Sequence, residues 1–136
     1  AGLPARNIKT PCSQIDIYPT LCELAGIQPP PYIDGKSMVP VLTGRAQKVR
    51  DNVFAVYKDL QRMVHDGRWK LIQYNRSPEQ GGTGTERLQL FDLHSDPWEL
   101  KDLSDDPRYH AELERLLSSL QHMQAELDDP LLRAYN

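Results

Sequence analysis

A long amphipathic pattern near the C-terminus dictates much of the architecture. Between residues 107 and 129, apolar side chains recur at helical spacing within an arc of about 120° (Tyr109, Leu113, Leu116, Leu117, Leu120, Met123 and Leu127). Asp106 is placed to cap this helix, Pro107 suits its first position, and we expect Pro130 to end it. A helix of about twenty residues is roughly 30 Å long. Because the helix has a single apolar stripe, we expect that stripe to pack against another apolar surface of the protein.

The segment before that helix predicts an antiparallel sheet. Residues 53–58, 61–65, 69–74 and 88–93 have the composition and length of strands. Asp66-Gly67, with Arg68 at the join, is a strong hairpin signal between the second and third. Residues 69–74 carry apolar side chains on both faces, which is typical of a central strand. The sequence therefore predicts an α+β fold, a four-stranded antiparallel sheet covered by a long C-terminal helix.

Residues 13–25 form a second helical pattern of a different kind. Ser13 can cap this helix with Asp16 as the reciprocal acid, Asp16 is an alternative cap because Pro19 must lie early, and Gly26 ends it. Its apolar arc spans about 180°, wider than a helix on the surface of a small domain needs (Ile15, Ile17, Tyr18, Leu21, Cys22, Leu24 and Ala25). We predict that this helix docks on a larger body.

Composition and charge remove several classes of protein. The chain has 136 residues, and 16 Lys plus Arg against 19 Asp plus Glu give a net charge of −3. A nucleic-acid partner usually requires a basic face, so we expect none. No apolar run reaches the roughly 18 residues of a membrane span, and we expect no membrane partner. Residues 46–51 are polar and basic, and we place a boundary there that divides the chain into residues 1–50 and 51–136.

Few residues carry an obvious chemistry. Cys12 lies at a helix start, but no base accompanies it, and it is too far along the chain from Cys22 for a disulfide, so both are predicted to be buried thiols. The stretch of Asp92, His94, Asp96 and Glu99 has donor types for a cation, but Asp96-Pro97 is typical of a turn and Asp92 should alternate outward on a strand, so a turn and a solvated face are the preferred interpretation. Asn75-Arg76-Ser77 matches a glycosylation sequon, weakened by the Pro78 that follows.

Lys58, Arg62 and His65 form the most suggestive basic group. Arg62 and Val64 should lie on the face opposite Met63 and His65. An exposed basic side chain on a sheet can contact an anionic ligand, although a solvated cross-strand partner would show the same pattern.

Four segments in order resemble one family. S-Q-I-D-I-Y-P-T-L-C-E-L-A-G (residues 13–26), D-G-K-S-M-V-P-V-L-T-G (34–44), R-M-V-H-D-G-R-W-K-L-I (62–72) and L-Q-L-F-D-L-H-S-D-P-W-E-L-K-D-L (88–103) are similar to the C-terminal portion of formylglycine-dependent sulfatases of the alkaline phosphatase superfamily. The resemblance implies that residues 1–50 are a helical arm ending an α/β catalytic domain. It implies that residues 51–136 are the C-terminal subdomain packed against that domain.

The resemblance also indicates what this chain lacks. The family's nucleophile is a formylglycine made from the cysteine of a Cys-x-Pro-Ser-Arg type motif, whereas Cys12 is followed by Ser13-Gln14-Ile15. The family's calcium ligands and sulfate-binding residues precede the first matching segment. We therefore expect this chain, an excised piece without an initial methionine, to hold no catalytic or metal-binding residue and to be inactive alone, while calcium and formylglycine belong to the parent enzyme.

The implied role is architecture together with one wall of the substrate cleft. The candidate cleft residues are Tyr57, Lys58, Arg62 and His65, and the loop of residues 75–86 is a second candidate. The implied partners are the rest of the catalytic domain and a sulfated small molecule or glycan, with self-association through the first helix as another expectation. The family implies a periplasmic, extracellular or lysosomal location.

Two other functions stay open. One is a fragment of a related phosphodiesterase or phosphonate hydrolase of the same superfamily. The other is a free-standing binding module, which should have no large exposed apolar patch.

Overall fold

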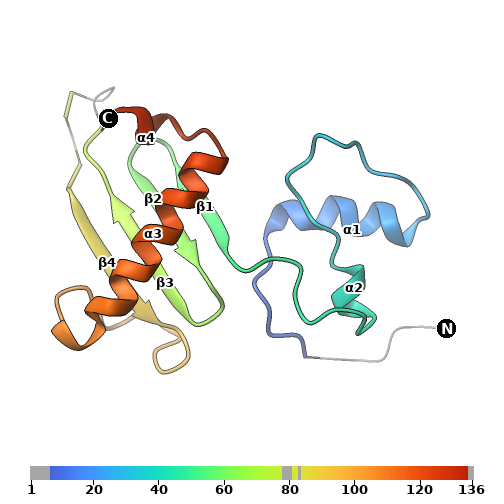
Figure 1. Cartoon of the computed structure of the whole chain (residues 1–136), viewed down its shortest axis with the longest axis horizontal. Coiled ribbons are helices and arrows are strands. Elements are labelled where there is room, and N and C mark those ends of the chain that lie inside the picture. The colour runs from blue at the N-terminus through green and yellow to red at the C-terminus, as the bar shows by residue number, and fades with distance from the viewer. Residues whose placement is uncertain (1–6, 78–80, 83, 135–136) are drawn as a thin grey trace. The chain divides into compact units, whose positions relative to one another are not determined.

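The computed structural model describes residues 7–77, 81–82 and 84–134, and the chain divides into two compact units, residues 1–53 and 54–136. Figure 1 shows the order of the elements. The first unit contains a short 3₁₀ helix (Gln14–Asp16), α1 (Ile17–Leu24) and α2 (Val39–Leu42). Strand β1 (Val53–Tyr57) begins at the boundary between the two units. The second unit then contains β2 (Gln61–His65), β3 (Trp69–Tyr74), β4 (Arg87–Asp92), α3 (His110–Glu126) and α4 (Pro130–Ala134).

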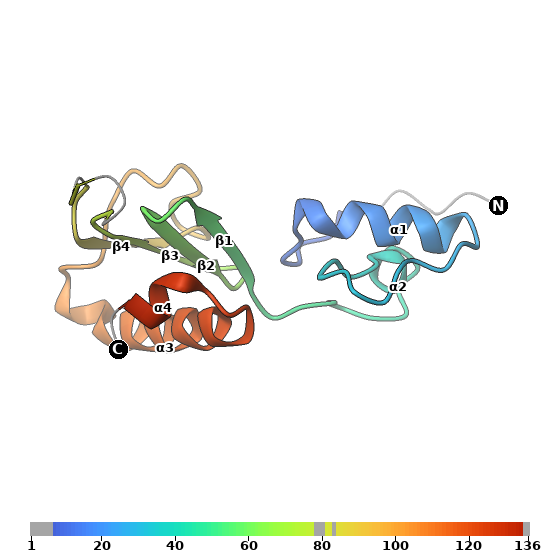
Figure 2. The same ribbon diagram turned by 90° about the horizontal axis from the view of Figure 1, so that it is seen from above.

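The sheet of the second unit is a four-stranded antiparallel meander with strand order β1-β2-β3-β4. In the registered pairs, Val64 lies opposite Leu71, and Leu71 lies opposite Leu90. These residues share one face because side chains alternate along a strand. Helix α3 runs along that face and contacts β2 and β3 (Figure 2). The predicted α+β fold, with its long covering helix and central third strand, is confirmed.

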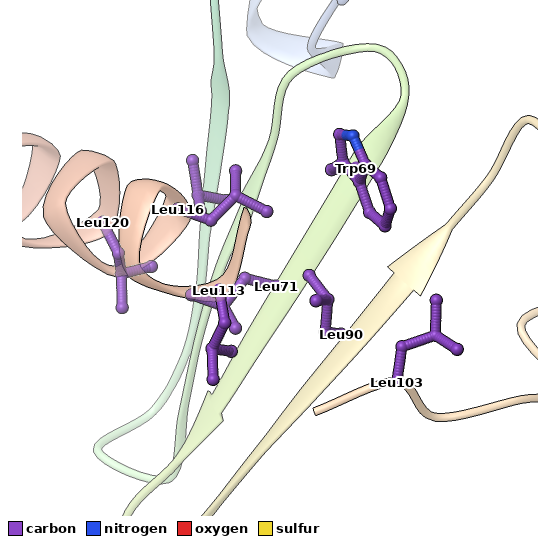
Figure 3. Close-up of a cluster of buried hydrophobic side chains, with 8 residues drawn as sticks. Trp69, Leu71, Leu90, Leu103, Leu113, Leu116 and Leu120 are labelled. Carbon is purple, nitrogen blue, oxygen red and sulfur yellow. The ribbon is translucent and has the colours of Figure 1, made fainter. Parts of the chain in front are cut away.

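The core of this unit lies between α3 and the sheet. Its buried members come from the strands, the loop after β4 and the helix stripe (Val64, Trp69, Leu71, Leu90, Leu103, Leu113, Leu116 and Leu120). Figure 3 shows the α3 leucines facing Leu71 and Leu90. Burying one such side chain stabilises a fold by about 1.5–3 kcal/mol relative to exposure. The predicted stripe thus supplies the helix half of the core through Leu113, Leu116 and Leu120, whereas its last member, Leu127, lies beyond the helix end and is 46% exposed.

The predicted cap and first residue open a short 3₁₀ helix (Pro107–Tyr109) that leads into α3 at His110, and α3 ends earlier than predicted. The Asp106 carboxylate accepts from the Arg108 amide at 3.1 Å, and Pro107 opens the first turn. The helix ends at Glu126, and Asp128 adopts the left-handed region with φ of +53°. The prediction that Pro130 ends this helix is wrong, because Pro130 instead begins α4, a position where its fixed φ and missing N–H are tolerated.

The first unit is held together by polar contacts around Asp16, which is 1% exposed. Its carboxylate accepts from the Ser13 amide at 2.8 Å, from the Lys36 amide at 2.8 Å and from the Arg50 guanidinium. Gly35 brings the returning loop so close that a Cβ atom there would lie 2.2 Å from the Ile15 carbonyl oxygen. The capping box predicted for Ser13 and Asp16 is confirmed, and Asp16 also anchors the following loop.

The wide apolar arc of α1 is mostly exposed in this chain. Ile15, Ile17, Tyr18, Leu21 and Leu24 are each between 52% and 59% exposed. Only the inner side of the helix is covered, where Pro19, Thr20 and Cys22 are buried. Cys22 is therefore the buried thiol that we predicted, whereas Cys12 is exposed.

Candidate functional site

The turn between β1 and β2 carries two of the predicted cleft residues. Tyr57 ends β1, and Lys58 follows it with φ of +50°. Both side chains are exposed, and the Lys58 ammonium lies 5.8 Å from the centroid of the Tyr57 ring. The Leu60 amide donates to the Tyr57 carbonyl oxygen at 3.1 Å and closes the turn. This turn presents a cation and an aromatic ring together to solvent.

Arg62 lies beside this turn, but it is not the exposed cation that the sequence predicted. It is 3% exposed, because strand alternation places it on the α3 face of the sheet together with Val64. Its Nη2 donates to Asp129 Oδ1 at 2.7 Å and its Nε donates to the other Asp129 oxygen. Its Nη1 donates to the carbonyl oxygens of Lys58 at 2.6 Å and Gln61 at 2.8 Å. The guanidinium is occupied within the protein rather than directed at a ligand.

Asp129 completes this buried group. Besides Arg62, its carboxylate accepts from Gln124 Nε2 at 3.0 Å and from the Leu131 amide at 3.1 Å. Burial alone would raise the pKa of Asp129, but these donors outweigh it and hold that pKa below its ordinary value. The carboxylate therefore stays ionised and joins the end of α3 and the start of α4 to Arg62 on β2.

His65 lies apart from the other three predicted residues. It ends β2, three residues beyond Arg62, or roughly 10 Å along a strand at about 3.3 Å per residue. It is half-buried on the opposite face of the sheet, and its Nδ1 accepts from the Gly67 amide at 3.2 Å. The structure thus brings together Tyr57, Lys58 and Arg62 at one end of β2 and leaves His65 at the other.

The second candidate, the loop of residues 75–86, lies partly outside the described residues. At its start, the Asn75 amide donates to the Leu60 carbonyl oxygen at 2.8 Å, and the Ser77 hydroxyl donates to the Asp59 carboxylate. The loop therefore packs on the same β1–β2 turn. Asn75 is 4% exposed, so the folded chain does not present this sequon to a glycosylating enzyme.

The acidic stretch after β4 is structural. Asp92, predicted to point outward, is buried: it pairs with Trp69 in the ladder, and its carboxylate accepts from Arg68 at 3.0 and 2.9 Å. This contact, against the opposing effect of burial, lowers the pKa of Asp92 to about 2. Glu99 accepts two hydrogen bonds from Lys70, at 2.9 and 2.7 Å. These carboxylates are directed to basic partners and do not converge on a common point.

The described residues do not fit the cofactors that the sulfatase resemblance implies. Residues 7–77, 81–82 and 84–134 contain no group of three or more His, Cys, Asp or Glu side chains that could hold a metal ion. Cys12 is followed by Ser13-Gln14-Ile15 and does not match the Cys-x-Pro-Ser-Arg type motif of a formylglycine precursor.

The first unit has an apolar groove of about 320 Å³ beside α1. Its lining includes Cys12 and several large apolar side chains (Ile8, Ile17, Leu21, Met38 and Leu42). The groove continues the exposed face of α1, since Ile17 and Leu21 belong to both. This unit thus combines a polar interior at Asp16 with an apolar exterior.

Sequence reasoning missed Asp129 altogether and missed the arginine partner of Asp16. Asp129 binds Arg62 across 67 positions of the chain, and Asp16 binds Arg50 across 34. The only signal for Asp129 was an acid directly after the amphipathic helix. For Asp16 the capping pattern indicated one role but not the arginine.

Comparison with known proteins agrees with the fold. The family model described as N-sulphoglucosamine sulphohydrolase, C-terminal, matches residues 3–126. The choline-sulfatase of Rhizobium meliloti (strain 1021) is 38% identical over 106 residues, which are 73% of this chain and 19% of that protein. A solved structure of a 2-O GAG sulfatase is 33% identical with a TM-score of 0.66, covering 84% of this chain and 25% of the other.

A phosphonate monoester hydrolase of Agrobacterium radiobacter shares the fold as well. It is 26% identical, with a TM-score of 0.59 over 82% of this chain and 24% of that protein. The chain spans about a fifth to a quarter of the relatives that it matches.

These matches define the class: the chain is the C-terminal portion of a sulfatase, from the alkaline phosphatase superfamily. It belongs to the family described as N-sulphoglucosamine sulphohydrolase, C-terminal. In the part of the chain that the structure describes, no helix has the length and apolar character needed to cross a bilayer.

Proposed function

We propose that this chain is the scaffolding and cleft-forming part of an enzyme that hydrolyses sulfate esters. The observation that carries the proposal is the family match over residues 3–126, combined with a span of only about a fifth to a quarter of the sulfatase relatives. The formylglycine nucleophile and calcium belong to the preceding part of the parent enzyme, because the residues described in this chain suit neither. The chain alone is then inactive.

The partner of the first unit is the rest of the sulfatase catalytic domain. Residues 1–50 end that α/β domain, and residues 51–136 form the C-terminal subdomain. Two features support this assignment: the exposed aliphatic face of α1 and the groove continuous with it. An exposed face of this size argues against a free-standing module. Without its partner, the same face would drive self-association.

The proposed contact with substrate lies at the β1–β2 turn. Lys58 offers an ammonium group and Tyr57 a ring, which suits a sulfated small molecule or a sulfated glycan. Arg62 supports the turn from beneath rather than touching substrate. His65, at the far end of β2, would line a separate part of the cleft.

A phosphonate or phosphodiester hydrolase is the second candidate. The shared fold of the Agrobacterium radiobacter enzyme favours it, because sulfate and phosphonate esters present similar anionic oxygens. A Cys-x-Pro-Ser-Arg type motif upstream in the parent would favour the sulfatase, whereas a Thr or Ser nucleophile would favour the rival.

We further propose that the parent is exported to the periplasm, the extracellular space or a lysosome. The sulfatase relatives support this location by analogy alone. Finding the intact parent in the cytosolic fraction of its cell would refute it.

The decisive experiment uses the intact parent enzyme with 4-nitrophenyl sulfate, choline sulfate, a sulfated glycosaminoglycan disaccharide and a phosphonate monoester. We expect turnover of at least one sulfate ester in preference to the phosphonate, and none by this chain alone. Lys58→Asn removes the charge while tolerating the left-handed backbone, and should raise KM about tenfold if one charge-assisted contact is lost. Lys58→Arg, which keeps the charge, should stay close to wild type. An unchanged KM in Lys58→Asn would remove this turn from the cleft.

A further inference from the structure

The geometry points to the buried Arg62–Asp129 pair as a positioning device that sets the β1–β2 turn and, through it, the direction of Tyr57 and Lys58. This inference rests on the proposed function, because it assigns the pair to the substrate-facing turn of that same site. Neither Arg62 nor Asp129 is expected to touch substrate, since both are about 97% buried at the side chain.

The turn needs an external hold because its backbone is unfavourable. Lys58 has φ of +50°, a region that non-glycine residues other than Asn and Asp seldom adopt. The turn itself is closed by the hydrogen bond from the Leu60 amide to the Tyr57 carbonyl oxygen at 3.1 Å. The orientation of the Lys58 carbonyl oxygen depends on the backbone conformation of Lys58. This oxygen accepts a hydrogen bond from Arg62 Nη1 at 2.6 Å. Arg62 therefore holds the peptide unit that a relaxed turn would rotate.

Only a guanidinium can make this set of contacts. One edge, Nε and Nη2, holds both oxygens of Asp129, and the remaining Nη1 holds the Lys58 and Gln61 carbonyl oxygens. A lysine has a compact ammonium group that can keep the charge pair but cannot span both sides. The contact with Lys58 is therefore separable from the ion pair by substitution.

Asp129 fixes the guanidinium from the other side. Its carboxylate is itself oriented by Gln124 Nε2 from α3 and by the Leu131 amide at the start of α4. Gln124 is 5% exposed and belongs to the helix whose leucines fill the core. Through Asp129, the β1–β2 turn is thus connected to the helix that covers the core of the second unit.

The test compares Arg62→Lys with Arg68→Lys in the intact parent enzyme, measured on the panel substrate that it turns over best. Arg68 also binds an aspartate, Asp92, but it lies at the β2–β3 connection, the opposite end of the strand. We expect Arg62→Lys to raise KM about tenfold, the effect of losing one hydrogen bond to a charged group, with kcat little changed. We expect Arg68→Lys to leave KM unchanged.

Amide hydrogen exchange on the same variants gives a readout that does not need activity. In Arg62→Lys the amides of Leu60 and Asn75, which bond within and onto the turn, should exchange about tenfold faster, because local opening controls their protection. The amide of Leu103, which bonds to Leu90 in the core, should keep its wild-type rate in both variants.

The outcomes separate this inference from the proposed function. If Lys58→Asn leaves KM unchanged, the cleft assignment fails, and the exchange rates alone decide whether the pair orders the turn. If Lys58→Asn raises KM while Arg62→Lys alters only thermal stability, the positioning role is refuted. Equal increases in KM for Arg62→Lys and Arg68→Lys would also refute it, because they would indicate a general loss of stability.

Discussion

In residues 54–136 a set of large aliphatic side chains is buried in one core, although Leu100 is 84% exposed, whereas in residues 1–53 those of α1 lie mostly on the outside. Leu71, Leu90, Leu116 and Leu120 have no exposed surface, while Leu21 is 59% exposed. Buried polar groups occur in both units, since Asp16 is 1% exposed in the first and Arg62 is 3% exposed in the second. The same chain thus holds one unit with a core of its own and another that leaves much of its apolar surface exposed.

The largest expected effect comes from separating the two units. Residues 54–136 should fold alone and unfold cooperatively, because eight buried side chains already form a closed cluster. Residues 1–53 should show little stable structure, because a helix of eight residues is marginal without a partner. Circular dichroism during thermal unfolding of each piece measures this. Cooperative unfolding of residues 1–53 on their own would contradict the expected difference in stability between the two units.

Matched leucine substitutions sharpen the contrast. Leu116→Ala should destabilise the isolated chain by about 2–5 kcal/mol, because it leaves a cavity in the α3–sheet core. Leu21→Ala should change the stability of the same chain by less than about 0.5 kcal/mol, as is usual for exposed positions. Urea denaturation gives both values. Equal losses would mean that α1 is enclosed by this chain after all.

The second unit should also lose stability at acid pH through a specific carboxylate. The pKa of Asp92 is lowered to about 2, chiefly by its hydrogen bond from Arg68. A group with a lowered folded-state pKa stabilises the fold above its unfolded value near 4, and that contribution disappears as the pH falls toward 2. Asp92→Asn should therefore flatten the pH dependence of the free energy of unfolding between about pH 4 and pH 2.

Denaturation of residues 54–136 at several pH values measures that slope. Some slope should remain in the variant, because the pKa values of Asp102 and Asp129 are lowered too, by donors that outweigh their burial. If the Asp92→Asn variant showed the same slope as the wild type, Asp92 would not contribute to the pH dependence of the free energy of unfolding.

The elements that the sequence predicted well are those with local causes. The Asp106 cap, the leucine spacing of α3 and the Asp66-Gly67 turn each act within a few residues, and all three are found in the structure. The predicted end of α3 at Pro130 is wrong, because the left-handed backbone of Asp128 stops the helix first.

The errors at the candidate site concern partners that are distant in sequence. The sequence predicts that Arg62 and Asp92 are solvated, but both are buried, each with a specific ion-pair partner. Arg62 finds its partner 67 residues away, at the junction of α3 and α4. Pattern reasoning identifies a basic residue, but only the tertiary structure decides whether its donors meet a ligand or the protein.

Amide hydrogen exchange across α1 tests the central claim most directly. The amides of residues 17–24 should be weakly protected in this chain and at least about a hundredfold better protected in the intact parent enzyme, because burial of the apolar face suppresses local unfolding. The amides of α3 should be protected in both. Equal protection of α1 in the chain and in the parent would contradict the claim that the rest of a sulfatase covers this helix.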